Sequence, residues 1–395
     1  MKTAELKKEV QEILESNILP FWMNRTIDAE NGGFYGQIKG NNELNPTAHK
    51  GGILNARILW TFSAAYRVLQ NPDYLTVATR AKDYILTHFF DKEFGGTYWE
   101  LDYKGNPVDT KKQFYELGFM LYGLSEYARA TGDKEALEYG IKLFETIEKY
   151  SFDPQHNGYI EACTREWNPV EDNRLSDKDA NYPKSQNTHR HIIEPYTNLY
   201  RIWKDERLEK ALRNLILIFT NHILNPETHH LDLFFENDWT RGGGNLESYG
   251  HDIECSWLLH EAALVLGDPE VLKEVEPIVQ LVAKASEKGI QADHSMVHEA
   301  NLDTGVVDAD RHWWVQAEAV VGFLNIYQHF GDEHALKLGT DTWEYIKTHL
   351  IDYEEGEWFW SCDPEGHVNR VDDKAGFWKC PYHNSRMCLE IIERF

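Results

Sequence analysis

The feature that most constrains the fold is a repeat of paired helices that runs along the whole chain. Segments 53–69, 111–131 and 317–330 carry apolar residues at three- and four-residue spacing around most of their circumference. Helices that are apolar nearly all round are buried helices. Each is followed by a short polar break with Gly, Asp or Pro, which supplies turn geometry and a new N-cap, and then by a more charged helix.

The repeat can be placed along the sequence by its helix starts. We expect buried helices to start near residues 50, 111, 187, 250, 312 and 380. Their partners are expected near 72, 133, 205, 268 and 332, with the N-terminal helix 4–17 completing the last pair. Longer loops rich in Gly and aromatic residues follow the second helices, and short strands or hairpins are predicted there.

Twelve helices in six pairs, with one helix of each pair buried, predict an all-α closed ring with an inner and an outer layer. An open solenoid also stacks helix pairs. The irregular repeats, the long loops and the pairing of the first helix with the last favour closure. No linker divides residues 1–395, so we expect one domain, and 42% hydrophobic residues exclude a disordered chain.

Composition excludes several classes of partner. The net charge is −25 and no Lys/Arg run stands out, which argues against nucleic-acid binding. The five cysteines are odd in number and widely spaced, as in a reduced cytosolic chain. The N-terminus lacks the apolar region of a signal peptide, and no apolar run approaches the roughly 18 residues of a membrane span. We therefore expect a cytoplasmic protein with no membrane partner, either a monomer or a weak homodimer.

Polar and aromatic groups recur in the first turns of the predicted buried helices. If these helices all run the same way, the groups converge at one mouth of the ring, where helix N-termini favour negative charge on a bound oxygen. A histidine or tryptophan at one such place is more often structural, but recurrence in successive repeats is not required by packing. The residues concerned are Arg57, Tyr115, Asn187, His189, His191, His251, Glu254, Trp313, Trp314, Glu318, Trp378 and His383.

Spacing groups some of these residues on shared helix faces. The pairs with three- or four-residue spacing are Asn187 with His191, His251 with Glu254, and Trp314 with Glu318. A carboxylate beside a histidine fixes its tautomer and raises its basicity, as for a general base. We therefore expect Glu254 to orient His251, with Trp257 one turn further along the same stripe.

Other chemistries lack their motifs. His189 with His191, and His229 with His230, have no third ligand at a metal-binding spacing. His260 begins an HExxH pattern that Leu264 breaks. No GxSxG, GxGxxG or P-loop is present, so we expect no metal and no cofactor.

At these residues the chain resembles the N-acylglucosamine 2-epimerase superfamily, and within it the cellobiose 2-epimerase branch, which includes mannobiose 2-epimerases. The resemblance covers nearly the whole chain and is most specific in GHDIECSWLL (250–259) and KCPYHNSR (379–386). It implies an (α/α)6 barrel of six helical hairpins with short β-hairpins at one mouth. It also implies an isomerase that epimerises C2 at the reducing end of a β-1,4-linked disaccharide without a cofactor.

The resemblance also implies roles for individual residues. His251 and His383 would be the acid/base pair, His191 would support ring opening, and Arg57 and Asn187 would hold the O1/O2 side of the sugar. The residues implied to orient these groups or to bind the sugars are Tyr115, Glu254, Glu318, Trp257, Trp314 and Trp378, together with Asp179 in a rim loop.

The residue types suit this chemistry. Inverting C2 of an aldose requires the ring to open, the C2 proton to be removed beside the aldehyde, and a proton to return to the opposite face. Histidine titrates near neutrality and fits both proton steps, and Arg57 can stabilise the enediolate oxygen.

Three alternatives stay open from the sequence. An N-acetylglucosamine 2-epimerase or an aldose–ketose isomerase would use the same enediolate on a monosaccharide. A glycoside hydrolase would need a carboxylate pair, which Glu254 and Glu318 could form. A helical-repeat scaffold would have an open concave groove.

Overall fold

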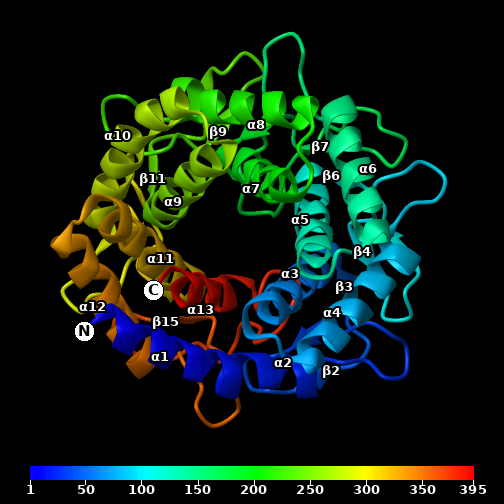
Figure 1. Ribbon diagram of the computed structural model, residues 1–395, viewed down its shortest axis with the longest axis horizontal. Coiled ribbons are helices and arrows are strands. Elements are labelled where there is room, and N and C mark those ends of the chain that lie inside the picture. The colour runs from blue at the N-terminus through cyan, green and yellow to red at the C-terminus, as the bar shows by residue number, and fades with distance from the viewer.

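The computed structural model describes residues 1–395 as two concentric rings of helices (Figure 1). The inner ring contains α3 (Gly52–Leu69), α5 (Phe114–Thr131), α7 (Gln186–Ile202), α9 (Tyr249–Leu266), α11 (Trp313–Phe330) and α13 (Tyr382–Arg394). The outer ring contains α4 (Pro72–Tyr84), α6 (Lys134–Tyr150), α8 (Glu206–Ile218), α10 (Pro269–Ser286) and α12 (Glu333–His349). Every one of these helices starts within three residues of its expected position.

The ring is closed by the two ends of the chain. The N-terminal segment runs from α1 (Thr3–Ile13) through a π turn (Leu14–Ile18) into α2 (Leu19–Arg25). In Figure 1 the blue α1 lies beside the red α13, and α13 also packs against α3 and α11. The predicted all-α (α/α)6 barrel is therefore confirmed, and the open groove expected of a helical scaffold is absent.

Local sequence explains why each hairpin turns where it does. Four inner helices end on a residue in the left-handed conformation, which releases the chain from the helix. These residues are Gln70, Gly132, Gly267 and Gly331. The outer helices then begin on a side chain that accepts a backbone N–H of the first turn. The capping residues are Asn71, Asp133, Asp205, Asp268 and Asp332.

Small antiparallel sheets join neighbouring helix pairs at the mouth where the inner helices begin. In five repeats a strand directly before the inner helix pairs with a strand from the following loop, as Lys50 and Gly51 pair with Leu101 and Glu100. These sheets are β3–β4–β5 (Lys50–Gly51, Glu100–Leu101, Pro107–Asp109), β6–β7 (Lys112–Gln113, Ala162–Cys163), β8–β9–β10 (Lys184–Ser185, Phe234–Phe235, Arg241–Gly242), β11–β12–β13 (Leu246–Ser248, Glu299–Asn301, Val306–Asp308) and β14–β15 (Arg311–His312, Ser361–Cys362). A separate hairpin joins β1 (Gln37–Ile38) to β2 (Leu44–Asn45). The predicted hairpins at one mouth are confirmed.

Buried lysine–aspartate pairs fix the entry to several inner helices. Lys50 stands two residues before α3, and its Nζ lies 2.9 Å from Asp28 Oδ2. Lys112 and Lys184 hold the same place before α5 and α7 and reach Asp91 and Asp153. Each lysine reaches back into the preceding loop, so the ion pair ties that loop to the start of the helix.

Removing one of these lysines is expected to destabilise the fold strongly. In Lys50→Met the Asp28 carboxylate loses its buried counter-ion, and breaking such a pair costs about 3–5 kcal/mol. Urea unfolding followed by circular dichroism measures the loss. Lys39→Met is the control, because Lys39 pairs with Glu43 on the surface. Equal midpoints for the two variants would contradict a structural role for the buried pair.

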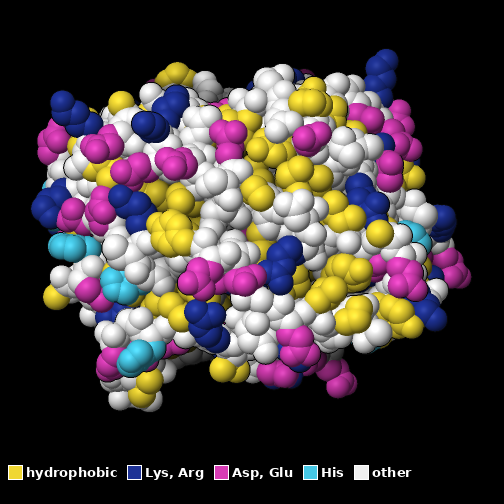
Figure 2. Space-filling model, turned by 90° about the horizontal axis from the view of Figure 1, so that it is seen from below, with side chains coloured by type: hydrophobic (Ala, Val, Ile, Leu, Met, Phe, Trp, Pro, Cys, Tyr) yellow, Lys and Arg dark blue, Asp and Glu magenta, His cyan; other side chains and the backbone are white.

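The surface carries mixed charge. On the face drawn in Figure 2, acidic and basic side chains are interspersed with scattered hydrophobic ones, without a continuous basic stripe. None of the helices combines the length and the apolar composition needed to cross a bilayer.

Candidate active site

The predicted residues from the first turns of the inner helices meet at one mouth of the barrel. Arg57 of α3 donates a hydrogen bond from Nη2 to the Tyr115 hydroxyl of α5 at 2.9 Å. The Tyr115 ring in turn lies 4.8 Å from the His191 ring of α7. The inner helices therefore all begin at this mouth, as the sequence predicted.

His383 of α13 is oriented by a carboxylate from the neighbouring helix α11. Its Nδ1 lies 2.7 Å from Glu318 Oε1, which assigns the proton to Nδ1 and leaves a lone pair on Nε2. Burial holds the pKa of His383 well below its usual range. The side chain is therefore neutral near pH 7, with an Nε2 that makes no hydrogen bond to the protein and can accept a proton.

His251 of α9 is the second histidine of this kind. Its Nδ1 lies 3.0 Å from the Ser248 hydroxyl, and its Nε2 makes no hydrogen bond to the protein. Burial, reinforced by the positive charge of Arg190, holds the pKa of His251 well below its usual range. His251 therefore shares the neutral state of His383 and its free ring nitrogen.

His191 differs because both of its ring nitrogens have partners. Its Nδ1 lies 3.0 Å from Glu194 Oε2, and its Nε2 lies 3.2 Å from the Arg190 Nη2 donor. Burial keeps the pKa of His191 well below its usual range, with Arg190 as the next cause. With its lone pair engaged by a cation, His191 suits a supporting role better than that of the base.

The expected pairing of Glu254 with His251 is wrong. The Glu254 carboxylate lies 3.1 Å from Arg190 and 2.7 Å from Arg386, and no hydrogen bond joins it to His251. The spacing does put both side chains on one face of α9. A buried carboxylate, however, requires a positive partner, and the two arginines supply it from α7 and α13.

Arg386 is the central residue that the sequence reasoning missed. Its guanidinium is completely buried and contacts the carboxylates of Glu194, Glu254 and Glu318. It is also flanked by the Trp257 ring at 4.7 Å. The sequence does hint at Arg386, because it lies one turn after His383 in the motif 379–386. Nothing in that motif, however, shows which groups Arg386 contacts.

Trp257 packs against Arg386 and hydrogen-bonds to Glu318. It is completely buried, and its Nε1 donates to Glu318 at 2.9 Å. The hydrogen bond indicates that Trp257 supports the Glu318–His383 pair. Trp314 and Trp378 differ from Trp257 in being only partly buried.

Trp314 forms one aromatic wall of the site, between the two histidines. Its ring lies 5.1 Å from that of His251 and 5.6 Å from that of His383. Gly250 permits this close approach, because a Cβ at that position would lie 2.8 Å from the indole. Trp378 stands elsewhere at the mouth, near Tyr115 and with its carbonyl 3.5 Å from Arg57 Nη1.

Arg57 is a buried cation without a carboxylate partner. Its guanidinium lies over the rings of Phe119 at 4.2 Å and Tyr382 at 4.9 Å, and its Nε has no hydrogen-bond partner. A buried donor with unused N–H groups is suited to an oxyanion that forms during a reaction.

A pocket beside His251 collects the predicted rim residues. Asn187 and Asp179 line it together with His251, Arg174 and Tyr182. The Asp179 carboxylate accepts hydrogen bonds from the backbone N–H and the hydroxyl of Ser176, so the loop has an anchor that the sequence did not reveal. The pocket also includes Glu161, another residue that the sequence reasoning missed, and burial raises its pKa to about 8.

The histidines set aside from the sequence have partners of their own. His189 Nδ1 lies 2.6 Å from the Ser185 carbonyl, while its Nε2 accepts the Tyr159 N–H at 2.9 Å. Burial lowers the pKa of His189 to about 3. His230 pairs with Asp252 at 2.6 Å, and His260 with Asn325 at 3.1 Å.

Comparison with known proteins identifies the family. The profile of the N-acylglucosamine 2-epimerase (GlcNAc 2-epimerase) family matches residues 33–385. The chain belongs to this family. Among 2-epimerases, it is 59% identical to a cellobiose 2-epimerase of Bacteroides fragilis and 40% identical to one of Ruminococcus albus, each match covering 98% of both chains.

The same family is found among solved structures. The structure of cellobiose 2-epimerase from Bacillus thermoamylovorans superimposes with a TM-score of 0.94 at 42% sequence identity. The match covers 99% of this chain and 100% of the other. The 2-epimerase fold is therefore shared from end to end.

Proposed function

We propose that this chain is a cofactor-independent isomerase that reversibly epimerises C2 at the reducing end of β-1,4-linked disaccharides. Cellobiose would give glucosyl-mannose, and mannobiose would give mannosyl-glucose. The observation that carries the proposal is the pair His251 and His383. His383 is buried and His251 is half-buried, both are neutral with a free Nε2, and both lie against Trp314. The high identity to cellobiose 2-epimerases over the full length supports the disaccharide substrate.

The reaction requires no group beyond those at the mouth. After the ring opens, one histidine of the pair takes the C2 proton through Nε2, and the electron pair moves into a C1–C2 double bond. The negative charge then resides on oxygen, where Arg57 and Asn187 can stabilise it. The other histidine, which has first taken up a proton from solvent at Nε2, returns it to the opposite face of C2 and is neutral again. The first histidine gives its proton to solvent, and ring closure releases the epimer. His191, held by Glu194 and Arg190, supports the proton transfers of ring opening.

The sugars have aromatic and polar partners. Flat indole faces bind the apolar faces of pyranoses, and Trp314 and Trp378 offer such faces at the mouth. The pocket that Asp179, Asn187 and His251 line offers polar contacts for a second sugar unit. These contacts support a disaccharide in preference to a monosaccharide.

The hydrolase alternative receives no support from the carboxylates. Glu254 and Glu318 are 0% and 1% exposed, and both accept from the same Nη2 of Arg386. Neither is free to protonate a glycosidic oxygen or to attack the anomeric carbon. We infer a cytoplasmic location for the enzyme, since all five cysteines are buried free thiols. A monomer or weak homodimer stays a prediction from the sequence.

Proton NMR of cellobiose and mannobiose in D2O tests the proposed function. We expect a new disaccharide epimer and deuterium at C2, because the proton passes through solvent-exchangeable histidine nitrogens. Free monosaccharide would indicate a hydrolase, and a ketose as the main product would indicate an aldose–ketose isomerase. Parallel reactions with N-acetylglucosamine and mannose test the monosaccharide alternative, which a higher kcat/KM on either sugar would favour.

A further inference from the structure

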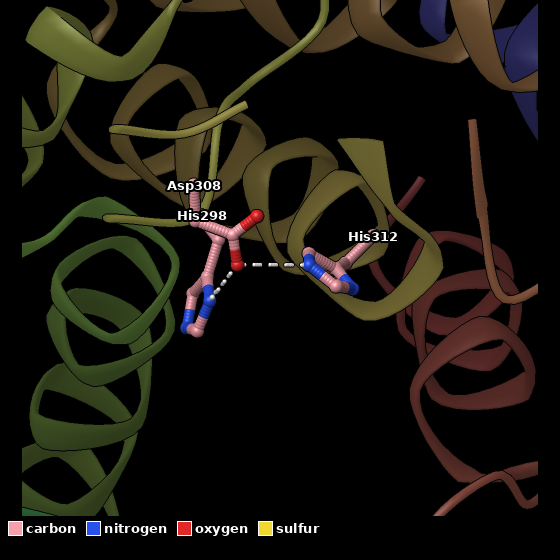
Figure 3. Close-up of side chains that lie close together, drawn as sticks. All are labelled: His298, Asp308 and His312. Carbon is pink, nitrogen blue, oxygen red and sulfur yellow. Dashed lines mark hydrogen bonds and ion pairs between the residues drawn. The ribbon is translucent and has the colours of Figure 1, made fainter. Parts of the chain in front are cut away.

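A second group of titratable side chains lies at the mouth, outside the residues that the proposed reaction uses. His298, Asp308 and His312 point toward one another (Figure 3). The same carboxylate oxygen, Asp308 Oδ2, lies 3.2 Å from His298 Nδ1 and 3.1 Å from His312 Nε2. Two imidazoles thus converge on one oxygen.

We propose that His298, Asp308 and His312 bind one divalent transition-metal cation of the Zn²⁺ type. Two imidazole nitrogens and a carboxylate oxygen are ligands that such ions prefer. Bonds of about 2.0–2.2 Å in tetrahedral geometry place neighbouring ligand atoms about 3.4 Å apart. The observed separations from Asp308 Oδ2 are within a few tenths of an ångström of that value. With neutral imidazoles the group carries one negative charge, which a cation offsets.

The backbone holds the three ligands in place. The pairing of β12 with β13 sets Glu299 opposite Asp308, which fixes His298, one residue earlier, beside the carboxylate. His312 ends β14, where it pairs with Ser361, and it also forms the N-cap of α11. Because Asp308 and His312 stand on paired strands and His298 directly precedes one, little reorganisation is needed when a cation enters.

The surrounding groups match what a bound histidine needs. His298 Nε2 is buried without a hydrogen-bond partner, and Glu299 Oε2 lies 3.9 Å away. Without a cation, the His298 tautomer that donates from Nδ1 to Asp308 has Nε2 as an unpaired buried acceptor. With a cation on Nδ1, the proton moves to Nε2 and faces the Glu299 carboxylate, which is the usual outer partner of a metal-bound histidine.

The site is also reachable. The side chains of His298, Asp308 and His312 are 20%, 38% and 15% exposed, so a water molecule can complete the coordination. Two other groups have ligand-type residues but are poorer candidates. Glu254, Glu318 and His383 are buried around Arg386, a cation that already offsets their charge. The Asp363–Glu365–His367 group has a single histidine, which is 79% exposed.

The site lies beside the reaction centre, so a bound cation would affect the residues around it. The His298 ring lies 5.2 Å from that of Trp314 and 5.7 Å from that of His251. A cation bound to His298 and His312 would tie the β12–β13 hairpin to the start of α11, which carries Trp314. We therefore expect bound metal to stabilise this part of the mouth.

Metal binding to the chelator-treated protein tests the proposal directly. Co²⁺ is titrated while its visible absorption bands are followed, and Zn²⁺ is titrated by calorimetry. The variants are His312→Gln, whose amide nitrogen can replace Nε2 as donor to Asp308, and His298→Asn, which does the same for Nδ1. Both keep the hydrogen bond but remove the ligand. Loss of an outer partner alone costs about 10–100-fold in affinity, so we expect at least tenfold weaker binding.

The controls are His367→Asn and His383→Asn, which alter the two competing groups. We expect both to keep the wild-type affinity for Zn²⁺. Wild-type affinity in His298→Asn and His312→Gln would overturn the proposal, as would loss of binding in either control. A thermal readout is independent of the titration, because a cation that binds only the folded state raises Tm. Zn²⁺ should raise Tm of the wild type more than that of His312→Gln, and equal shifts would overturn the proposal.

Discussion

His383→Asn is expected to lower kcat/KM for the epimerisation of cellobiose by about 10²–10⁴-fold, the usual contribution of a general acid or base. The substitution is chosen from the geometry. The asparagine amide nitrogen can replace Nδ1 as donor to Glu318, while no group replaces the free Nε2. The packing around Glu318 and Arg386 is therefore kept, and only the proton acceptor is removed.

The measurement is the rate of C2 deuteration and epimer formation in D2O, with circular dichroism to verify folding. His334→Asn is the matched control, because His334 lies on the outer helix α12 with its side chain 54% exposed. We expect the control to retain full activity. A folded His383→Asn enzyme with near wild-type turnover would show that the proton is handled elsewhere.

The fold could be predicted from the sequence because its signals are local. Apolar periodicity marks a buried helix, and a Gly or Asp at the break marks its end, so each of the expected helix starts was placed within three residues. Convergence at one mouth followed from topology, since inner helices of a closed ring that are connected through outer helices must run in the same direction. Arg57, Tyr115 and His191 lie in contact for this reason.

The pairing of charges could not be predicted in the same way. Spacing on α9 placed Glu254 beside His251, but the partners that decide its contacts are Arg190 and Arg386, from helices distant in the sequence. The cluster of His298, Asp308 and His312 was missed for a related reason. Asp308 and His312 are four residues apart, but His298 comes beside them through the pairing of the three-residue strands β12 and β13, whose register no short motif specifies.

We expect the second large effect from Arg386→Met, which should lower both the stability of the fold and the activity. Glu194, Glu254 and Glu318 bring three carboxylates into the barrel, and Arg190 and Arg386 supply two positive charges. Burial raises the pKa of Glu194 and Glu318, and Arg386 opposes that rise. Methionine fills a similar volume but leaves the carboxylates with one cation fewer, and breaking a buried ion pair in this way costs about 3–5 kcal/mol. Urea unfolding measures the loss, and Arg207→Met, a surface arginine on α8, is the control.

The glutamates provide the test of this explanation. If the loss comes from uncompensated negative charge, then Glu254→Gln should destabilise the wild type but cost much less in the Arg386→Met background, because the amide removes one of the surplus charges. Equal losses in both backgrounds would mean that Arg386 acts through packing against Trp257 and Tyr382 instead. Activity separates the two roles further. Glu318 has Trp257 as a second donor, so the variant with both Arg386→Met and Glu254→Gln can still orient His383. If its activity returns together with its stability, Arg386 serves catalysis by holding the carboxylates in place.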